Sequence, residues 1–79
     1  MRILFFAQLK DATKCDSVEI AFASTVGVEQ LWSELLDKFP ALAVHRPSVR
    51  LAKNCEYTVP DERFSDADEV ALIPPVSGG

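Results

Sequence analysis

The chain has 79 residues, 48% of them hydrophobic, which suits one compact domain and argues against intrinsic disorder. Its formal net charge of −4 disfavours nucleic acid as a partner, because an acidic surface repels the phosphate backbone and no cluster of Lys and Arg offsets that repulsion. No apolar run approaches the roughly 20 residues of a membrane span and no signal-peptide pattern opens the chain, so we expect a soluble, cytoplasmic protein.

Two strands are predicted first. Residues 2–8 include β-branched and aromatic side chains, which favour a strand, and the polar stretch 10–14 predicts a turn after it. Residues 16–22 alternate between apolar and polar side chains. This alternation predicts a half-buried strand that pairs with the first strand as a hairpin.

An amphipathic helix is predicted next. Thr25 carries the hydroxyl of a helix N-cap, and Pro40 ends the helix because its ring cannot continue the hydrogen-bond ladder. Between them, apolar residues recur every three or four positions and predict a buried stripe. The stripe consists of Val28, Leu31, Trp32, Leu35, Leu36 and Phe39. Residues 41–48 are expected to be irregular.

A second hairpin is predicted from the alternation in residues 49–53 and the short run 57–59, which Pro60 stops. Asn54 and Cys55 fall where a two-residue turn would connect these strands. Asparagine tolerates the left-handed backbone conformation that such a turn requires.

The last strand is predicted at residues 69–73, after a charged connection, 61–68, that Phe64 anchors. The order β-β-α-β-β-β predicts an α+β fold, with one main helix packed on one face of a mixed sheet of about five strands. The first and last strands are the most apolar and are expected at the centre.

One helix covers only one face of the sheet. The apolar residues on the other face are therefore expected to dock a partner, unless residues 41–48 cover part of them.

Side-chain chemistry is sparse. His45 has no nucleophile or carboxylate at a spacing that indicates catalysis, and Cys15 and Cys55 lack the pattern of a zinc site. Two free thiols fit a reducing compartment best, although a disulfide between them stays open. The acidic residues of 66–69 favour a solvated turn over a metal site. We therefore predict no metal.

The segment after the last strand is more informative. Pro74 and Pro75 cannot donate to a sheet ladder, so the chain is expected to leave the sheet as a stiff, extended arm. Gly78 and Gly79 end that arm without side chains, which suits entry into a narrow channel. The residues after Pro74 could reach about 16 Å. We predict a folded domain at residues 1–74 and a tail at 75–79.

Four segments together resemble the small, sulfur-carrying subunits of molybdopterin synthase, a ubiquitin-like family. They are residues 4–9, 25–26, 52–54 and, above all, the acidic turn, apolar strand, double proline and diglycine of 66–79. The resemblance implies a ubiquitin-like β-grasp fold. It also implies that an ATP-dependent activating enzyme adenylates the carboxylate of Gly79, which then becomes a thiocarboxylate.

In that scheme the tail inserts into the large synthase subunit. There the sulfur passes to cyclic pyranopterin monophosphate, and a heterotetramer completes the dithiolene of molybdopterin. The inserted arm comprises Pro74, Pro75, Val76, Ser77 and Gly78, while Phe6 and Ile73 contact the large subunit. The resemblance implies no permanently bound cofactor, and it implies a carrier subunit whose catalytic partners supply the reactive side chains.

Three other functions stay open. A sulfur carrier for thiamine synthesis shares the diglycine and the activation chemistry. A protein modifier would instead form an isopeptide bond from Gly79 to lysines of target proteins. A plain interaction module with the same fold would not use the diglycine chemically.

Overall fold

The computed structural model describes residues 1–75, which form one five-stranded sheet, one two-stranded sheet and four helical segments. The strands are β1 (Arg2–Phe5), β2 (Ser17–Glu19), β3 (Val26–Gly27), β4 (Arg50–Lys53), β5 (Glu56–Tyr57), β6 (Arg63–Phe64) and β7 (Glu69–Ile73). The helices are α1 (Gln8–Thr13) and α2 (Val28–Lys38), with the 3₁₀ helices η1 (Pro40–Val44) and η2 (Arg46–Ser48) after them. None of the helices in this part of the chain has the length and apolar composition that crossing a membrane requires.

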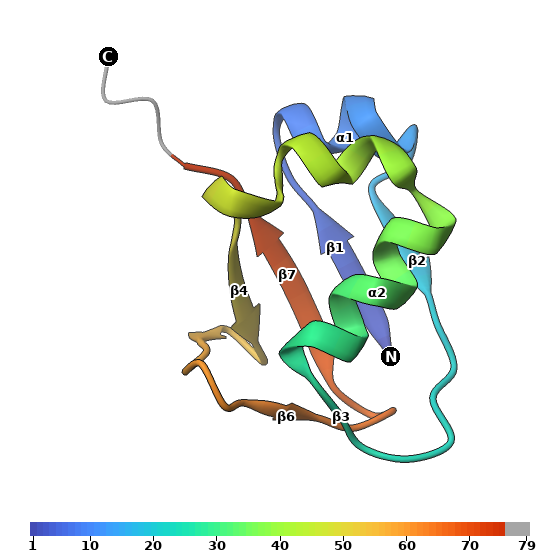
Figure 1. The fold of residues 1–79 in the computed structure, drawn as a ribbon, viewed down its shortest axis with the longest axis vertical. Helices are drawn as coiled ribbons and strands as arrows, with labels where there is room; N and C mark the ends of the chain where they lie inside the picture. Colours follow the sequence, from blue (N-terminus) through green and yellow to red (C-terminus); the bar gives the residue numbers. More distant parts are fainter. Residues whose placement is uncertain (76–79) are drawn as a thin grey trace.

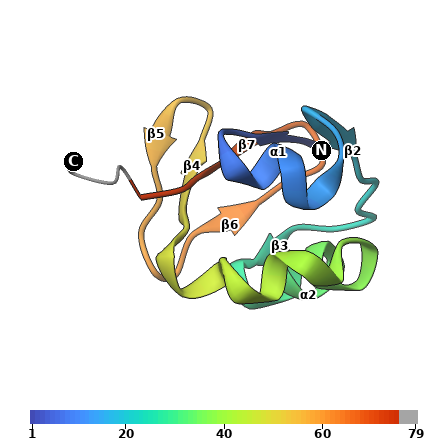
Figure 2. The ribbon, with the colours of Figure 1, turned by 90° about the horizontal axis from the view of Figure 1, so that it is seen from above.

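The main sheet has the strand order β2-β1-β7-β4-β5 (Figure 1). β1 and β7 are parallel and the other pairs are antiparallel, so the sheet is mixed. Figure 2 shows α2 on one side of this sheet. The predictions of a mixed five-stranded sheet, of one main helix on one face and of interior first and last strands are confirmed. The arrangement is the ubiquitin-like β-grasp fold.

The core lies between α2 and the alternate residues of β1 and β7 that face it. Ile3, Val70 and Leu72 from the strands and Leu31 and Leu35 from the helix have no exposed side-chain surface. Each such burial stabilises the fold by roughly 1.5–3 kcal/mol. The predicted apolar stripe of the helix therefore faces the core as expected.

The first predicted strand was too long, and the predicted turn after it was wrong. β1 ends at Phe5, and residues 8–13 form the short helix α1. Leu9 and Thr13 lie one helical turn apart and are both buried. Their burial favours a helix, although the polar residues around them suggested a turn. Lys14 then ends the helix in the left-handed conformation, with φ 63°.

Thr25 is not the N-cap of α2, which is a second correction. The helix begins at Val28, with Gly27 as its N-cap and no side-chain capping hydrogen bond. Val26 pairs with Phe64, and both side chains are buried, so the chain before the helix is extended as strand β3. The Thr25 carbonyl instead accepts a hydrogen bond from the guanidinium of Arg63, at 3.2 Å.

The second half of the chain follows the predictions more closely. β7 has the predicted bounds, Phe64 is fully buried, and Asn54 and Cys55 form the two-residue turn with φ of 51° and 74°. Residues 41–48, expected to be irregular, lie in η1 and η2 apart from His45. The strand predicted at 57–59 is β5, two residues at 56–57, and β6 was not predicted.

Candidate functional site

The chain leaves the sheet at Pro74, after an interior strand. β7 lies between β1 and β4 and ends at Ile73. Pro74 is half-buried and Pro75 is exposed. The predicted site residues Val76, Ser77, Gly78 and Gly79 lie outside the described residues, so the boundary between residues 1–74 and a tail at 75–79 stays a prediction.

The structure brings together the two predicted partner-binding residues, Phe6 and Ile73. They line the same hollow of about 260 Å³ on the face of the sheet opposite α2. We call this hollow the open-face groove. Its lining residues are Phe6, Ala52, Cys55, Tyr57, Ala71 and Ile73. Phe6 is 43% exposed and Tyr57 is 57% exposed, so two large aromatic rings of this groove contact solvent.

Strand register explains the shape of the open-face groove. Ala71 pairs with Leu4 on one side and with Ala52 on the other, and Ala52 pairs with Tyr57. This row crosses four strands, about 14 Å at the usual strand spacing. Its two alanines lie side by side, and because they are small they leave the hollow whose sides carry the larger rings of Phe6 and Tyr57.

The family resemblance named Phe6 and Ile73 as contacts of the large subunit. It did not name their neighbours in the groove, Ala52, Tyr57 and Ala71. The alternation of side chains between the two faces of each strand could have indicated these residues. Leu51 and Leu72 are the apolar residues that α2 covers, so the residues next to them, Ala52 and Ala71, must face the opposite side.

Hydrogen bonds attach the β4–β5 hairpin to the start of β7. The backbone N–H of Asn54 donates to the Glu69 carbonyl at 2.8 Å, and the Glu69 N–H donates to the Asn54 side-chain oxygen at 3.0 Å. The Asn54 side-chain amide also donates to the Asp68 carboxylate at 3.1 Å. These bonds hold the hairpin that carries Cys55 and Tyr57, and so they position one side of the open-face groove.

The acidic turn before β7 uses its carboxylates as hydrogen-bond acceptors. The Phe22 backbone N–H donates to Asp66 at 2.9 Å, and together with the N-terminal ammonium it lowers the pKa of that carboxyl below its ordinary 3.8. The Ser65 N–H donates to Asp68 at 2.7 Å and is the main cause of the lowered pKa of Asp68. The predicted turn is thus present.

These lowered pKa values predict that acid destabilises the fold. Both carboxyls bind protons more weakly in the folded than in the unfolded chain, so their stabilisation is complete above their ordinary pKa and is lost as the pH falls below it. We expect the urea midpoint of unfolding to fall between about pH 5 and about pH 2. Asp68→Asn should reduce this dependence, whereas Asp61→Asn, which alters an exposed carboxyl outside these hydrogen bonds, should not. Equal pH dependence in all three proteins would contradict the assignment.

The remaining reactive side chains stand apart. Cys15 is half-buried and Cys55 is exposed, and both are free thiols. His45 is half-buried between η1 and η2. Among residues 1–75, no three side chains of His, Cys, Asp or Glu are placed to share a metal ion.

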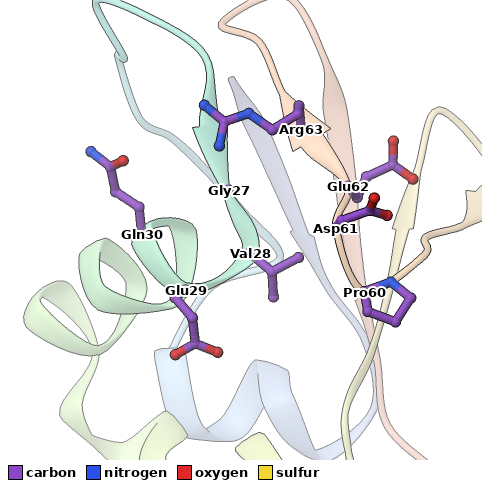
Figure 3. A pocket seen from close by; sticks show the side chains of 8 residues that line it. All are labelled: Gly27, Val28, Glu29, Gln30, Pro60, Asp61, Glu62 and Arg63. Carbon is purple, nitrogen blue, oxygen red and sulfur yellow. The ribbon is translucent and has the colours of Figure 1, made fainter.

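A larger hollow than the open-face groove, about 530 Å³, lies at the opposite end of β7 from Ile73. It is lined by Gly27, by the start of α2 and by residues 60–63 (Figure 3). The carboxylates of Asp61 and Glu62 point away from Gly27 in Figure 3. The guanidinium of Arg63 is bound to Thr25. This hollow therefore offers no converging set of reactive groups, and the open-face groove is the better candidate.

Comparison with known proteins identifies the family of the chain. The model of the ThiS family matches residues 3–79. The molybdopterin synthase sulfur carrier subunit of Arabidopsis thaliana is 35% identical over 79 residues, which cover 100% of this chain and 82% of that protein. The subunit of the same name from Homo sapiens is 32% identical over 82 residues, covering 100% of this chain and 93% of the human protein.

A solved structure is also similar over its whole length. The crystal structure of SAMP1, a small archaeal modifier protein from Haloferax volcanii, matches with a TM-score of 0.86 and 26% identity. The match covers 100% of this chain and 98% of that one.

Proposed function

Because the chain belongs to the ThiS family, we propose that it carries sulfur for molybdopterin synthesis on the carboxylate of Gly79. Its relatives in plants and animals are named molybdopterin synthase sulfur carrier subunits. The observation that carries the proposal is the position of the open-face groove at the start of the arm. Ile73 lines the groove and Pro74 follows it directly. A partner that covers the groove is therefore placed to receive the residues that come next.

Activation begins at the Gly79 carboxylate, which is a poor electrophile. In the proposal, a carboxylate oxygen attacks the α-phosphorus of ATP on an activating enzyme, and pyrophosphate leaves. Attack by a sulfide-level nucleophile on the acyl carbon then expels AMP and produces the thiocarboxylate. This chain contributes an unhindered acyl group, because neither of its last two residues carries a side chain.

Sulfur transfer takes place inside the large subunit of molybdopterin synthase. The arm of Pro74, Pro75, Val76, Ser77 and Gly78 inserts. The terminal sulfur attacks a side-chain carbon of cyclic pyranopterin monophosphate, and a C–S bond forms as a C–O bond of that carbon breaks. Hydrolysis of the resulting thioester leaves the sulfur on the pterin and restores the carboxylate. Docking supplies much of the rate by holding the nucleophile at the reacting carbon.

The chain acts as a carrier and co-substrate in this scheme, and the large subunit supplies the catalytic side chains. Phe6 and Ile73 contact that subunit through the open-face groove. We propose a heterotetramer of two carriers on a dimer of large subunits. No cofactor stays bound to the carrier, and ATP is consumed by the activating enzyme.

Similarity to the archaeal modifier favours a second candidate function. The TM-score of 0.86 at 26% identity is compatible with a chain that is conjugated to other proteins. Activation at Gly79 would be the same, but a lysine amine of a target protein would then attack the acyl carbon. The two functions differ in the nucleophile, not in the carrier.

Intact-mass measurement distinguishes these functions. The purified chain is incubated with ATP, the activating enzyme and a sulfide source, with the variant lacking Gly79 as control. We expect a mass gain equal to one oxygen replaced by sulfur in the full chain and no gain in the control. Transfer to the pterin precursor on addition of the large subunit would identify the pathway. Conjugates of higher mass would favour the modifier, and an unchanged mass with an enzyme active on another carrier would contradict both.

A further inference from the structure

Arg50 stands out among the charges on the open face of the sheet. Leu51, its neighbour on β4, faces the core, so Arg50 faces the opposite side together with Ala52. Arg2, on the same face, lies 4.0 Å from the Glu69 carboxylate. Among residues 1–75, Arg50 takes part in none of the ion pairs, although the chain as a whole is acidic.

The position of Arg50 places it next to the end of β7 and the open-face groove. It pairs in register with Ile73, the last residue of β7. Its guanidinium carbon lies 4.1 Å from the centre of the Tyr57 ring, close enough for a cation–π contact. Tyr57 is itself part of the groove. The arginine is thus held against an aromatic wall, and less side-chain entropy remains to be lost when it binds.

A partner protein that covers the open face of the sheet must provide an anion for Arg50. A partner that contacts Ile73 and Tyr57 must also remove water from Arg50, which lies between them in the sheet. A guanidinium that loses its water without gaining an anion is strongly unfavourable, and arginine cannot escape by losing its proton. Tyr57 satisfies only the face of the guanidinium, because its in-plane N–H groups need oxygen acceptors.

We infer that Arg50 binds a carboxylate side chain of the partner protein that covers the open-face groove. This inference rests on the proposed function, since it assumes that the groove is the docking surface. A carboxylate matches the planar N–H pairs of the guanidinium with two parallel hydrogen bonds. The contact also supplies specificity, because a protein with an apolar surface but no acid at this point leaves the arginine unpaired.

The test measures binding to the purified large subunit of molybdopterin synthase by calorimetry. Arg50→Gln removes the charge and keeps a long polar side chain at an exposed position. Arg46→Gln is the matched control, because Arg46 also lies over an aromatic ring, 5.4 Å from the centre of Trp32, but it pairs with Glu29 of α2. Circular dichroism melting checks that both variants fold.

We expect Arg50→Gln to raise the dissociation constant by at least about thirtyfold and Arg46→Gln to leave it within about threefold. The affinity of Arg50→Gln should also depend less on salt. Arg50→Glu should bind more weakly still and should be rescued when one acidic residue of the large subunit is changed to lysine, which a purely structural arginine would not allow.

The outcomes separate this inference from the proposed function. If the unaltered chain binds and Arg50→Gln binds equally well, the inference is wrong and the proposed function stands. The inference is also wrong if both glutamine variants weaken binding equally, or if no charge reversal restores binding to Arg50→Glu. If the unaltered chain does not bind the large subunit, the proposed docking surface is wrong and the inference fails with it.

Discussion

Adding one alanine after Gly79 is expected to abolish thiocarboxylate formation and to leave the melting temperature of the protein unchanged. The added residue moves the reacting carboxylate by about 3.3 Å and places a methyl group beside it. Productive geometry at a reacting centre tolerates far less displacement than this. Mass spectrometry after the activation reaction should therefore detect less than about 1% of the product obtained with the unaltered chain, a loss of at least about a hundredfold.

Binding provides the control for this extension. The described part of the open-face groove ends at Ile73, six residues before Gly79 in the sequence, so docking through the groove should persist in the extended chain. Calorimetry with the large subunit checks this expectation. Normal sulfur loading of the extended chain would show that the Gly79 carboxylate is not the acceptor, and the proposed function would then be wrong.

Two adjacent phenylalanines are expected to have opposite effects when substituted. Phe5 is 1% exposed, and its ring meets that of Phe39 edge to face at 5.5 Å. Phe5→Ala should cost about 3–5 kcal/mol, a large part of the stability of a domain this small. Its melting temperature should fall by more than about 12 °C in a calorimetric or circular dichroism scan.

Phe6, the next residue along the chain, is 43% exposed at the open-face groove. Phe6→Asp should change the melting temperature by only a few degrees, because most surface substitutions have small effects on stability. It should weaken binding of the large subunit by about a hundredfold or more, since a charge then faces an apolar contact. Strong binding by Phe6→Asp, or an unaltered melting temperature of Phe5→Ala, would contradict the assignment of these two side chains.

The parts of the fold that the sequence predicted well share a repeated signal. The stripe of α2 recurs over three turns, and β7 combines an unbroken apolar run with a proline stop. The missed elements are shorter than any such repeat. α1 spans six residues, of which Leu9 and Thr13 are buried, and β3 and β6 span two residues each. Elements this short are selected by the surfaces they pack against, which a local pattern does not contain.

The wrong prediction of an N-cap at Thr25 has a related cause, a contact between residues that are distant in the sequence. Its residue type and position suited a cap, but pairing of Val26 with Phe64 keeps the backbone extended for two more residues. That pairing joins segments almost 40 residues apart, and no local rule anticipates it. Tertiary contact therefore decided where the helix begins.

For the candidate site, the family resemblance named two of the groove residues, Phe6 and Ile73. Most of the predicted arm lies outside the described residues and stays a prediction. Tyr57 and Arg50 were not identified, because their roles depend on the register of β4 against β5 and β7. The strands were predicted, but not their order in the sheet or the pairs across it. A contact between a tyrosine and an arginine seven positions apart arises only after the hairpin has closed at Asn54 and Cys55.

The interior position of β7 has a mechanical consequence. In the proposed function, the chain is withdrawn from each partner after use, and a pull on its C-terminal residues is transmitted along the axis of β7. β7 is hydrogen-bonded to β1 on one side and to β4 on the other. A pull along the strand therefore loads both rows of hydrogen bonds in shear at the same time and does not break them one after another. An arm attached to an edge strand would load a single ladder. If the chain works as proposed, this topology lets it be withdrawn repeatedly while β7 stays in the sheet.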